Sequence, residues 1–193
     1  MQGEEKGAPR EWPVLDETPL RDFEVFRARR IRARSPEDGS EHTFHVADAP
    51  DGVLVIALAV DGRMVMVRQW RHPLQRVTLE LPAGIVEEGE APEAGAAREL
   101  REETGYQGDA PRLLGSVALN PSWQTTRLHT VLITNARPVG EKELDEGEDT
   151  RVCLLRPEEL RERVLRGDAD SAPVATALAM WEWSGRPGAG ADG

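Results

Sequence analysis

Residues 84–106 read GIVEEGEAPEAGAARELREETGY, and this stretch says more about the fold than any other part of the chain. Pro92 suits the first turn of a helix, where the N–H that proline lacks has no partner within the helix. Gly105 suits the position just after a helix ends, where the backbone often turns left-handed. The spacing of these two residues predicts a helix of about three turns.

Three glutamates lie on the second half of this predicted helix. Glu99, Glu102 and Glu103 are spaced i, i+3 and i+4, so their carboxylates project from one face. Such carboxylates repel one another unless a cation lies among them, and hard oxygen ligands suit Mg²⁺ or Mn²⁺. Taken alone, the three glutamates favour the interpretation of a solvated acidic helix face. The residues around them decide between the two interpretations.

The surrounding residues follow a fixed spacing. Gly84 lies six residues before Glu90, Glu90 lies eight before Arg98, and residues 98–106 read RELREETGY. This is the complete pattern GX5EX7REUXEEXGU, with U an apolar or aromatic residue, and it resembles the Nudix box at every fixed position. A chance match has a probability on the order of one in a million.

The resemblance to Nudix hydrolases implies a fold and a metal site. The implied fold is α/β (α+β), an α/β/α sandwich around a mixed sheet, which the interleaved strand and helix signals also indicate. Glu99 and Glu103 are expected to bind Mg²⁺, or Mn²⁺ in its place. Glu102 is expected to take part in metal binding and in catalysis, and the Ala83 carbonyl is the expected backbone ligand.

The remaining fixed positions of the box have structural roles by the same resemblance. Arg98 is expected to pair with Glu90 and to orient the helix without touching substrate, so its loss would loosen the site indirectly. Gly84 and Gly105 allow backbone conformations or contacts that a Cβ would hinder. The chemistry implied is attack on a diphosphate by a water molecule that the metal activates, with a carboxylate as the base.

Residues 68–73 read RQWRHP, and they resemble the RQYRHP segment of ADP-ribose and nucleotide-sugar pyrophosphatases, with Trp70 where Tyr is usual. The resemblance continues through TLELPAG at residues 78–84. It implies that Arg71 binds a phosphate of the substrate, with Arg68 a further substrate contact and Glu80 a metal or substrate contact.

Two later segments extend the resemblance to this subfamily. Pro121 lies sixteen residues beyond Gly105, as in ADP-ribose pyrophosphatases, and Trp123 stands where a small residue is usual. Trp123 could stack on a base of the substrate or fill the core. In LDEGED at residues 144–149, the resemblance implies that Glu148, with Glu146 as the alternative, is the catalytic base. A solvated acidic loop is the other interpretation of that segment.

The composition limits the remaining possibilities. A chain of 193 residues that is 39% hydrophobic suits one domain with a substantial core. The net charge of −11 argues against binding to nucleic acid. The absence of long apolar runs argues against a membrane span or a secretory signal, so we expect a cytoplasmic protein. The expected organisation is a tail at 1–9, one domain at 10–184 comprising N-terminal strands at 10–48 and a catalytic core at 49–184, and a second tail at 185–193.

Local patterns predict the individual elements. An N-terminal hairpin is expected within residues 23–48, and residues 53–60 read VLVIALAV, a run suited to a buried strand that pairs with residues 63–70. Further strands are expected near residues 78–84, 113–119, 127–136 and 151–155. Further helices are expected at residues 157–167 and 171–183, the latter with Val174, Leu178 and Trp181 on one face.

The leading hypothesis is Mg²⁺-dependent hydrolysis of ADP-ribose, or of a related nucleoside diphosphate sugar, to a nucleoside monophosphate and a sugar phosphate. A hydrolase of nucleoside triphosphates or dinucleotides is one alternative, and a Nudix-fold nucleotide sensor without turnover is another. The resemblance also implies a homodimer whose N-terminal strands form the interface.

Overall fold

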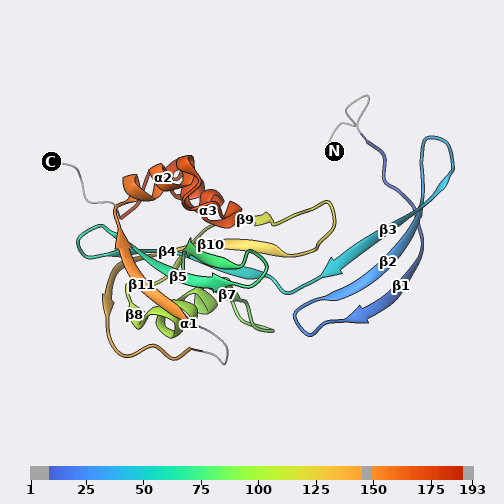
Figure 1. Cartoon of the computed structure of the whole chain (residues 1–193). Helices are drawn as coiled ribbons and strands as arrows, with labels where there is room; N and C mark the ends of the chain where they lie inside the picture. The colour runs from blue at the N-terminus through green and yellow to red at the C-terminus, as the bar shows by residue number, and fades with distance from the viewer. Residues whose placement is uncertain (1–8, 145–148, 189–193) are drawn as a thin grey trace. The chain divides into compact units, whose positions relative to one another are not determined.

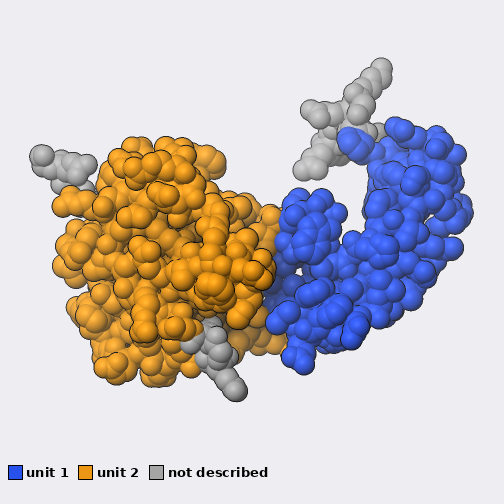
Figure 2. All heavy atoms as spheres, in the orientation of Figure 1, with its two compact units in different colours: residues 1–50, 120–126 blue, residues 51–119, 127–193 orange. Residues whose placement is uncertain are grey.

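The structure is a computed structural model that describes residues 9–144 and 149–188 (Figure 1). The chain divides into two compact units (Figure 2). The first unit comprises Met1–Pro50 and Asn120–Thr126, and the second comprises Asp51–Leu119 and Arg127–Gly193.

The first unit contains an antiparallel sheet in the order β1-β2-β3, with β1 at Val14–Asp22, β2 at Arg27–Arg34 and β3 at Glu41–Asp48. Ion pairs between opposing strands accompany the backbone ladder. Arg29 of β2 contacts Glu17 at 2.8 Å and Asp48 at 2.6 Å. Residues 120–126 join this unit through a bridge between Ala47 and Gln124. The N-terminal hairpin predicted from the sequence is therefore present as part of a three-stranded sheet.

Two details of this sheet differ from the sequence prediction. The strand predicted from Phe23 begins at Arg27, because residues 23–26 form a turn in which Phe23 N–H donates to the Phe26 carbonyl and Glu24 has a φ of 67°. Strand β1 was not predicted, since its sequence VLDETPLRD has little apolar alternation and contains Pro19. Proline is tolerated at this position because β1 is an edge strand.

The second unit is built on a mixed sheet. Its described part has eight strands in the main order β11-β5-β4-β10-β8, with β6 beside β5, β7 beside β4 and β9 beside β10. Strands β4 and β10 run parallel, and the other pairs are antiparallel. The strands are β4 (Gly52–Ala59), β5 (Met64–Arg71), β6 (Arg76–Glu80), β7 (Ala83–Ile85), β8 (Tyr106–Gln107), β9 (Arg112–Ala118), β10 (Arg127–Pro138) and β11 (Thr150–Leu155).

The apolar run of β4 is buried on both faces of this sheet. Val53 and Val55 belong to one hydrophobic cluster, whereas Leu54 and Ile56 belong to another. Successive side chains of a strand point to opposite faces, so a strand covered on both sides needs apolar residues at every position. This requirement explains why the sequence shows a continuous apolar run here.

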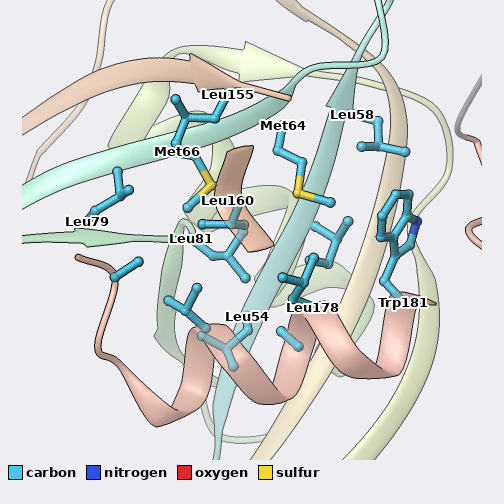
Figure 3. Packing of buried hydrophobic residues seen from close by; sticks show 14 of the residues in the cluster. Leu54, Leu58, Met64, Met66, Leu79, Leu81, Leu155, Leu160, Leu178 and Trp181 are labelled. Carbon is cyan, nitrogen blue, oxygen red and sulfur yellow. The ribbon is translucent and has the colours of Figure 1, made fainter. Parts of the chain in front are cut away.

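Helices α2 (Pro157–Arg166) and α3 (Ala172–Trp183) cover one face of the sheet. Leu160 of α2 is completely buried, as is Trp181 of α3, and Val174 and Leu178 are nearly so. Figure 3 shows Leu178 and Trp181 beside Leu54 and other buried residues of the strands. The predicted inward face of the last helix is thus confirmed.

Helix α1 (Pro92–Thr104) covers the opposite face and matches the helix predicted from the box. Its inward side chains, Ala96 and Leu100, pack against the cluster that contains Val53 and Val55. The helix ends at Gly105, whose φ of 71° is left-handed and whose N–H donates to the Arg101 carbonyl. In the described residues, no helix is long and apolar enough to cross a membrane.

Candidate metal and substrate site

Arg98 forms the centre of a charged network at the outer face of α1. Its Nη1 donates to Glu99 at 2.8 Å and to Glu102 at 3.1 Å. Its Nε and Nη2 donate to the two oxygens of Glu90 at 3.2 and 3.0 Å, and Nη2 also donates to the Ile85 carbonyl at 2.9 Å. Arg98 therefore ties α1 to the loop that precedes it.

The electrostatics of this network favour the charged forms. Hydrogen bonds to Glu90 raise the pKa of Arg98 above its ordinary value, with Glu99 and Glu102 adding to the effect. Hydrogen bonds from Arg98 hold the pKa of Glu90 below its ordinary value. The expected pairing of Arg98 with Glu90 is observed, and Arg98 also contacts two of the candidate metal ligands directly.

Glu103 is the most buried of the three glutamates, with only 3% of its surface exposed. Its Oε2 accepts a hydrogen bond from the backbone N–H of Ala83 at 3.1 Å. Ala83 opens β7, directly before Gly84. The structure thus brings Glu103 next to the residue whose carbonyl was predicted to share the metal.

Gly84 lies against the carboxylate of Glu99. A Cβ at Gly84 would come within 2.0 Å of the Glu99 carboxyl group, which no side chain can accept without displacement. The same holds, less severely, at Gly95, where a Cβ would lie 2.8 Å from Oε2 of Glu90. Glycine at these positions lets α1 and its carboxylates approach the preceding loop closely.

These residues offer a set of donors that fits a divalent cation. Glu99 and Glu102 converge on a single cationic nitrogen of Arg98, which shows that their oxygens can share one positive charge. Glu103 and the Ala83 backbone lie close together. Across residues 9–144 and 149–188, no group of three acidic, His or Cys side chains is already arranged around a metal position.

Arg71 and Glu80 form a second charged group, on β5 and β6. Arg71 donates from Nε and Nη2 to the two oxygens of Glu80, at 2.8 and 2.6 Å, and Thr78 also donates to Glu80. Burial by itself raises the pKa of Glu80, but the hydrogen bonds from Arg71 and Thr78 outweigh it and bring the pKa below its ordinary value. Glu80 is therefore an ionised carboxylate that orients Arg71.

Strand β5 directs the side chains of Arg68 and Arg71 to opposite faces of the sheet. Residues 68 and 71 are three positions apart on one strand, so their side chains leave opposite faces of the sheet. Arg71 shares a face with Gln69, and both line an open pocket of about 360 Å³ together with Trp70, His72, Pro73 and Asp149. Of the two predicted arginines, Arg71 is the one that contacts Glu80.

Three further residues were predicted to take part in catalysis or substrate binding. Glu146 and Glu148 lie outside the described residues. Trp123 belongs to the first unit, where it is half-exposed and its carbonyl accepts the N–H of Ala47 at 2.8 Å. Its predicted role as a substrate contact stays a prediction.

The structure also shows participants that the sequence analysis missed. Thr78 supports Glu80, and Thr150 donates from its hydroxyl to the Glu103 carbonyl at 3.0 Å. Lys142 donates from its ammonium group to the Thr150 carbonyl. Of these three residues, only Lys142 stands out in the sequence, because it is one of two lysines among 24 lysine and arginine residues.

Comparisons with known proteins identify the family of this chain. The model of the NUDIX domain matches residues 48–178. An ADP-ribose pyrophosphatase of Bacillus subtilis (strain 168) is 33% identical over 142 residues, covering 73% of this chain and 77% of that protein. An ADP-ribose pyrophosphatase of Mycobacterium tuberculosis is 32% identical over 176 residues, covering 90% and 84%.

Two further similarities widen the comparison. A methanol dehydrogenase activator of Bacillus methanolicus is 32% identical, covering 70% of this chain and 76% of that protein. A solved structure titled an ADP compounds hydrolase superposes with a TM-score of 0.82 over 95% of this chain and all of that one, at 18% identity, which supports the fold. The NUDIX domain matches about two thirds of this chain, and the glutamates of the box lie together on α1. This chain therefore belongs to the Nudix family of pyrophosphohydrolases.

Proposed function

We propose that this enzyme hydrolyses the diphosphate linkage of ADP-ribose or of a related nucleoside diphosphate sugar, and that Mg²⁺ is its metal. The observation that carries the proposal is the complete carboxylate set on α1, with Glu103 buried against Ala83 and Glu99 in contact with Arg98. The substrate class is supported by the relatives of similar length that are named ADP-ribose pyrophosphatases.

In this reaction the oxygen of a water molecule bonds to one phosphorus and the bridging P–O bond breaks. The products are a nucleoside monophosphate and a sugar phosphate, and the proton of the water passes to a carboxylate base. Glu99, Glu102, Glu103 and the Ala83 carbonyl would hold the metal. When bound, Mg²⁺ would neutralise the diphosphate and lower the pKa of the attacking water.

The chain's own residues would do the positioning. Arg71, held by two hydrogen bonds from its guanidinium to Glu80, would present its charge to a phosphate of the substrate in a fixed orientation. Arg98 would keep α1 and the preceding loop together while the carboxylates bind the metal. Glu148, or Glu146 in its place, remains our proposed base.

The proposal includes a homodimer formed through the N-terminal strands. The first unit supports it with an exposed aromatic cluster, in which Trp12 contacts His42 and Phe44 at ring-centroid distances of 5.3 and 5.7 Å. Trp12 and Phe44 are 39% and 44% exposed, and aromatic residues of this kind are enriched in protein interfaces.

A substrate panel tests the proposal. ADP-ribose, a nucleotide sugar, a dinucleotide and a nucleoside triphosphate would each be incubated with Mg²⁺ and with EDTA, and the phosphate monoesters followed by ³¹P NMR. Cleavage of ADP-ribose or the nucleotide sugar only with Mg²⁺ is the expected result, and ¹⁸O-labelled water would identify the phosphorus attacked. Preferential cleavage of the dinucleotide or triphosphate would reassign the substrate, and binding without turnover would support a sensor.

A further inference from the structure

The end of α1 is held by residues that come much later in the chain. The backbone N–H of Glu143 donates to the Glu102 carbonyl at 2.9 Å, and the Thr150 hydroxyl donates to the Glu103 carbonyl at 3.0 Å. The last carbonyl groups of a helix have no partner within the helix, so they need such external donors. Here the two carbonyls belong to residues whose carboxylates we assign to the metal.

Thr150 is well placed to fix this helix end. It lies at the start of β11, opposite Gln69 of β5, and it is completely buried. Bulk water therefore cannot take over the hydrogen bond that its hydroxyl makes. Strand β11 pairs with β5, which lies between β11 and β4 in the strand order of the sheet. The Thr150 hydroxyl therefore connects the backbone of Glu103 directly to the sheet.

Lys142 makes a second set of contacts with Thr150. Its ammonium group donates to the Thr150 carbonyl and lies 3.5 Å from the Thr150 hydroxyl. The chain uses arginine almost everywhere else, and a compact ammonium group can direct several donors at neighbouring oxygens where a planar guanidinium needs more room. The next residue, Glu143, pairs with Arg101 and caps Glu102, so this segment contacts α1 repeatedly.

We propose that Thr150 and Lys142 are positioning residues for the metal site, which set the position of the Glu102 and Glu103 carboxylates by fixing the last turn of α1. The proposal rests on the proposed function, because it takes these glutamates as metal ligands. Removing the hydroxyl of Thr150 leaves the Glu103 carbonyl buried without this donor. The helix end then shifts, and the carboxylates no longer converge on one cation.

The experiment measures Mn²⁺ binding alone, by electron paramagnetic resonance titration without substrate, on protein that circular dichroism shows to be folded. Thr150→Val removes the hydroxyl at nearly constant volume and is expected to weaken Mn²⁺ binding on the order of 10 to 100-fold. Thr150→Ser keeps the hydroxyl and should bind Mn²⁺ nearly as the parent protein does.

Thr130→Val is the matched control. Thr130 is also a buried strand threonine, 1% exposed, but within the described part of the structure its hydroxyl makes no hydrogen bond. This substitution should leave Mn²⁺ affinity unchanged. If Thr150→Val does not fold, Lys142→Met provides the second variant, and it should also weaken Mn²⁺ binding while Lys142→Arg recovers part of the loss.

The outcomes separate the two proposals. If the parent protein binds Mn²⁺ but Thr150→Val, or Lys142→Met in its place, binds it as tightly as Thr130→Val does, the positioning role is wrong and the proposed function stands. If the parent protein neither binds Mn²⁺ nor shows metal-dependent turnover, both proposals fail. A lower melting temperature with unchanged Mn²⁺ affinity would show a purely structural role and would also overturn the inference.

Discussion

At the scale of single residues, the candidate site contains carboxylates that each have a different environment. Glu103 is buried against a backbone N–H, Glu99 and Glu102 share the Arg98 guanidinium, and Glu80 is held by Arg71. Although the residue type is the same, burial and partners differ, so each carboxylate should respond differently to substitution.

Glu103→Gln should abolish most activity while leaving the fold intact. The amide keeps the shape of the side chain but loses the charge that a divalent metal requires, so we expect kcat to fall on the order of 10² to 10⁴-fold. Steady-state kinetics with ADP-ribose would measure the loss. Glu162→Gln, an exposed glutamate of α2 on the other side of the sheet, is the control and should be neutral. A folded Glu103→Gln enzyme with normal kcat would contradict the metal assignment.

Glu80 should contribute to the acid sensitivity of the fold. Its folded-state pKa lies below the ordinary value of 4.5, so in acid the unfolded chain binds the proton more tightly than the folded one. The stabilisation is complete above pH 4.5 and is lost as the pH falls through the lower, folded-state pKa. Urea unfolding between pH 6 and pH 3 should therefore show a shallower loss of stability for Glu80→Gln than for the parent protein. Identical slopes would refute this role for Glu80.

At the scale of elements, α1, which carries the candidate site, is fixed at both of its ends. Arg98 and Glu90 tie it to the loop before the helix, while Gly105 and the residues after β10 close its C-terminal end. The carbonyl of Gly105 accepts the N–H of Val139 at 2.8 Å, so strand β10 leads directly onto the helix end. The helix therefore holds its glutamates on a rigid support.

Gly105→Ala should destabilise the fold more than Gly89→Ala. Both glycines have left-handed backbones, with φ of 71° and 80°, which costs an alanine about 1–3 kcal/mol at each position. Only at Gly105 would the Cβ also meet the Gly140 carbonyl, at 2.4 Å, whereas nothing lies within 4 Å at Gly89. The free energies of unfolding from urea titration should differ accordingly. An equal loss of unfolding free energy in the two variants would show that the segment around Gly140 can move away from the new Cβ without destabilising the fold.

At the scale of the whole molecule, the two units have different kinds of surface. The second unit has a mixed sheet with hydrophobic clusters on both faces, which accounts for its independent core. The first unit is a three-stranded sheet with no cluster of comparable size in its described residues, and it exposes Trp12, Phe23 and Phe44. A thin sheet of this kind gains stability when a further surface covers it.

We therefore expect a dimer in solution, with about twice the mass of the 21.3 kDa chain. Sedimentation equilibrium would measure it, and Phe44→Ser should shift the equilibrium toward monomer because it removes an exposed ring from the aromatic cluster. Val60→Ser, a change of an exposed apolar residue in the second unit, is the control. A monomeric parent protein at micromolar concentration would contradict the dimer.

The sequence by itself determined the elements whose signals are local. Pro92 and Gly105 bracketed α1, the fixed spacing of the box indicated the family, and the apolar run of β4 indicated a buried strand. These signals succeed because helix ends, side-chain periodicity and a fixed motif depend on residues close together in the chain. The polar edge strand β1 lacks such a signal and was missed.

Only the tertiary structure decided which side chains meet. It joined Arg71 to Glu80 across β5 and β6, although the sequence had assigned both to the substrate without predicting that they would pair. It also brought Thr150 to Glu103, residues 47 positions apart. The strand register and the packing of α1 on the sheet set these contacts, and both result from burial of apolar surface across the whole unit. A hydrogen bond between distant residues follows from that packing and has no local pattern from which it could be predicted.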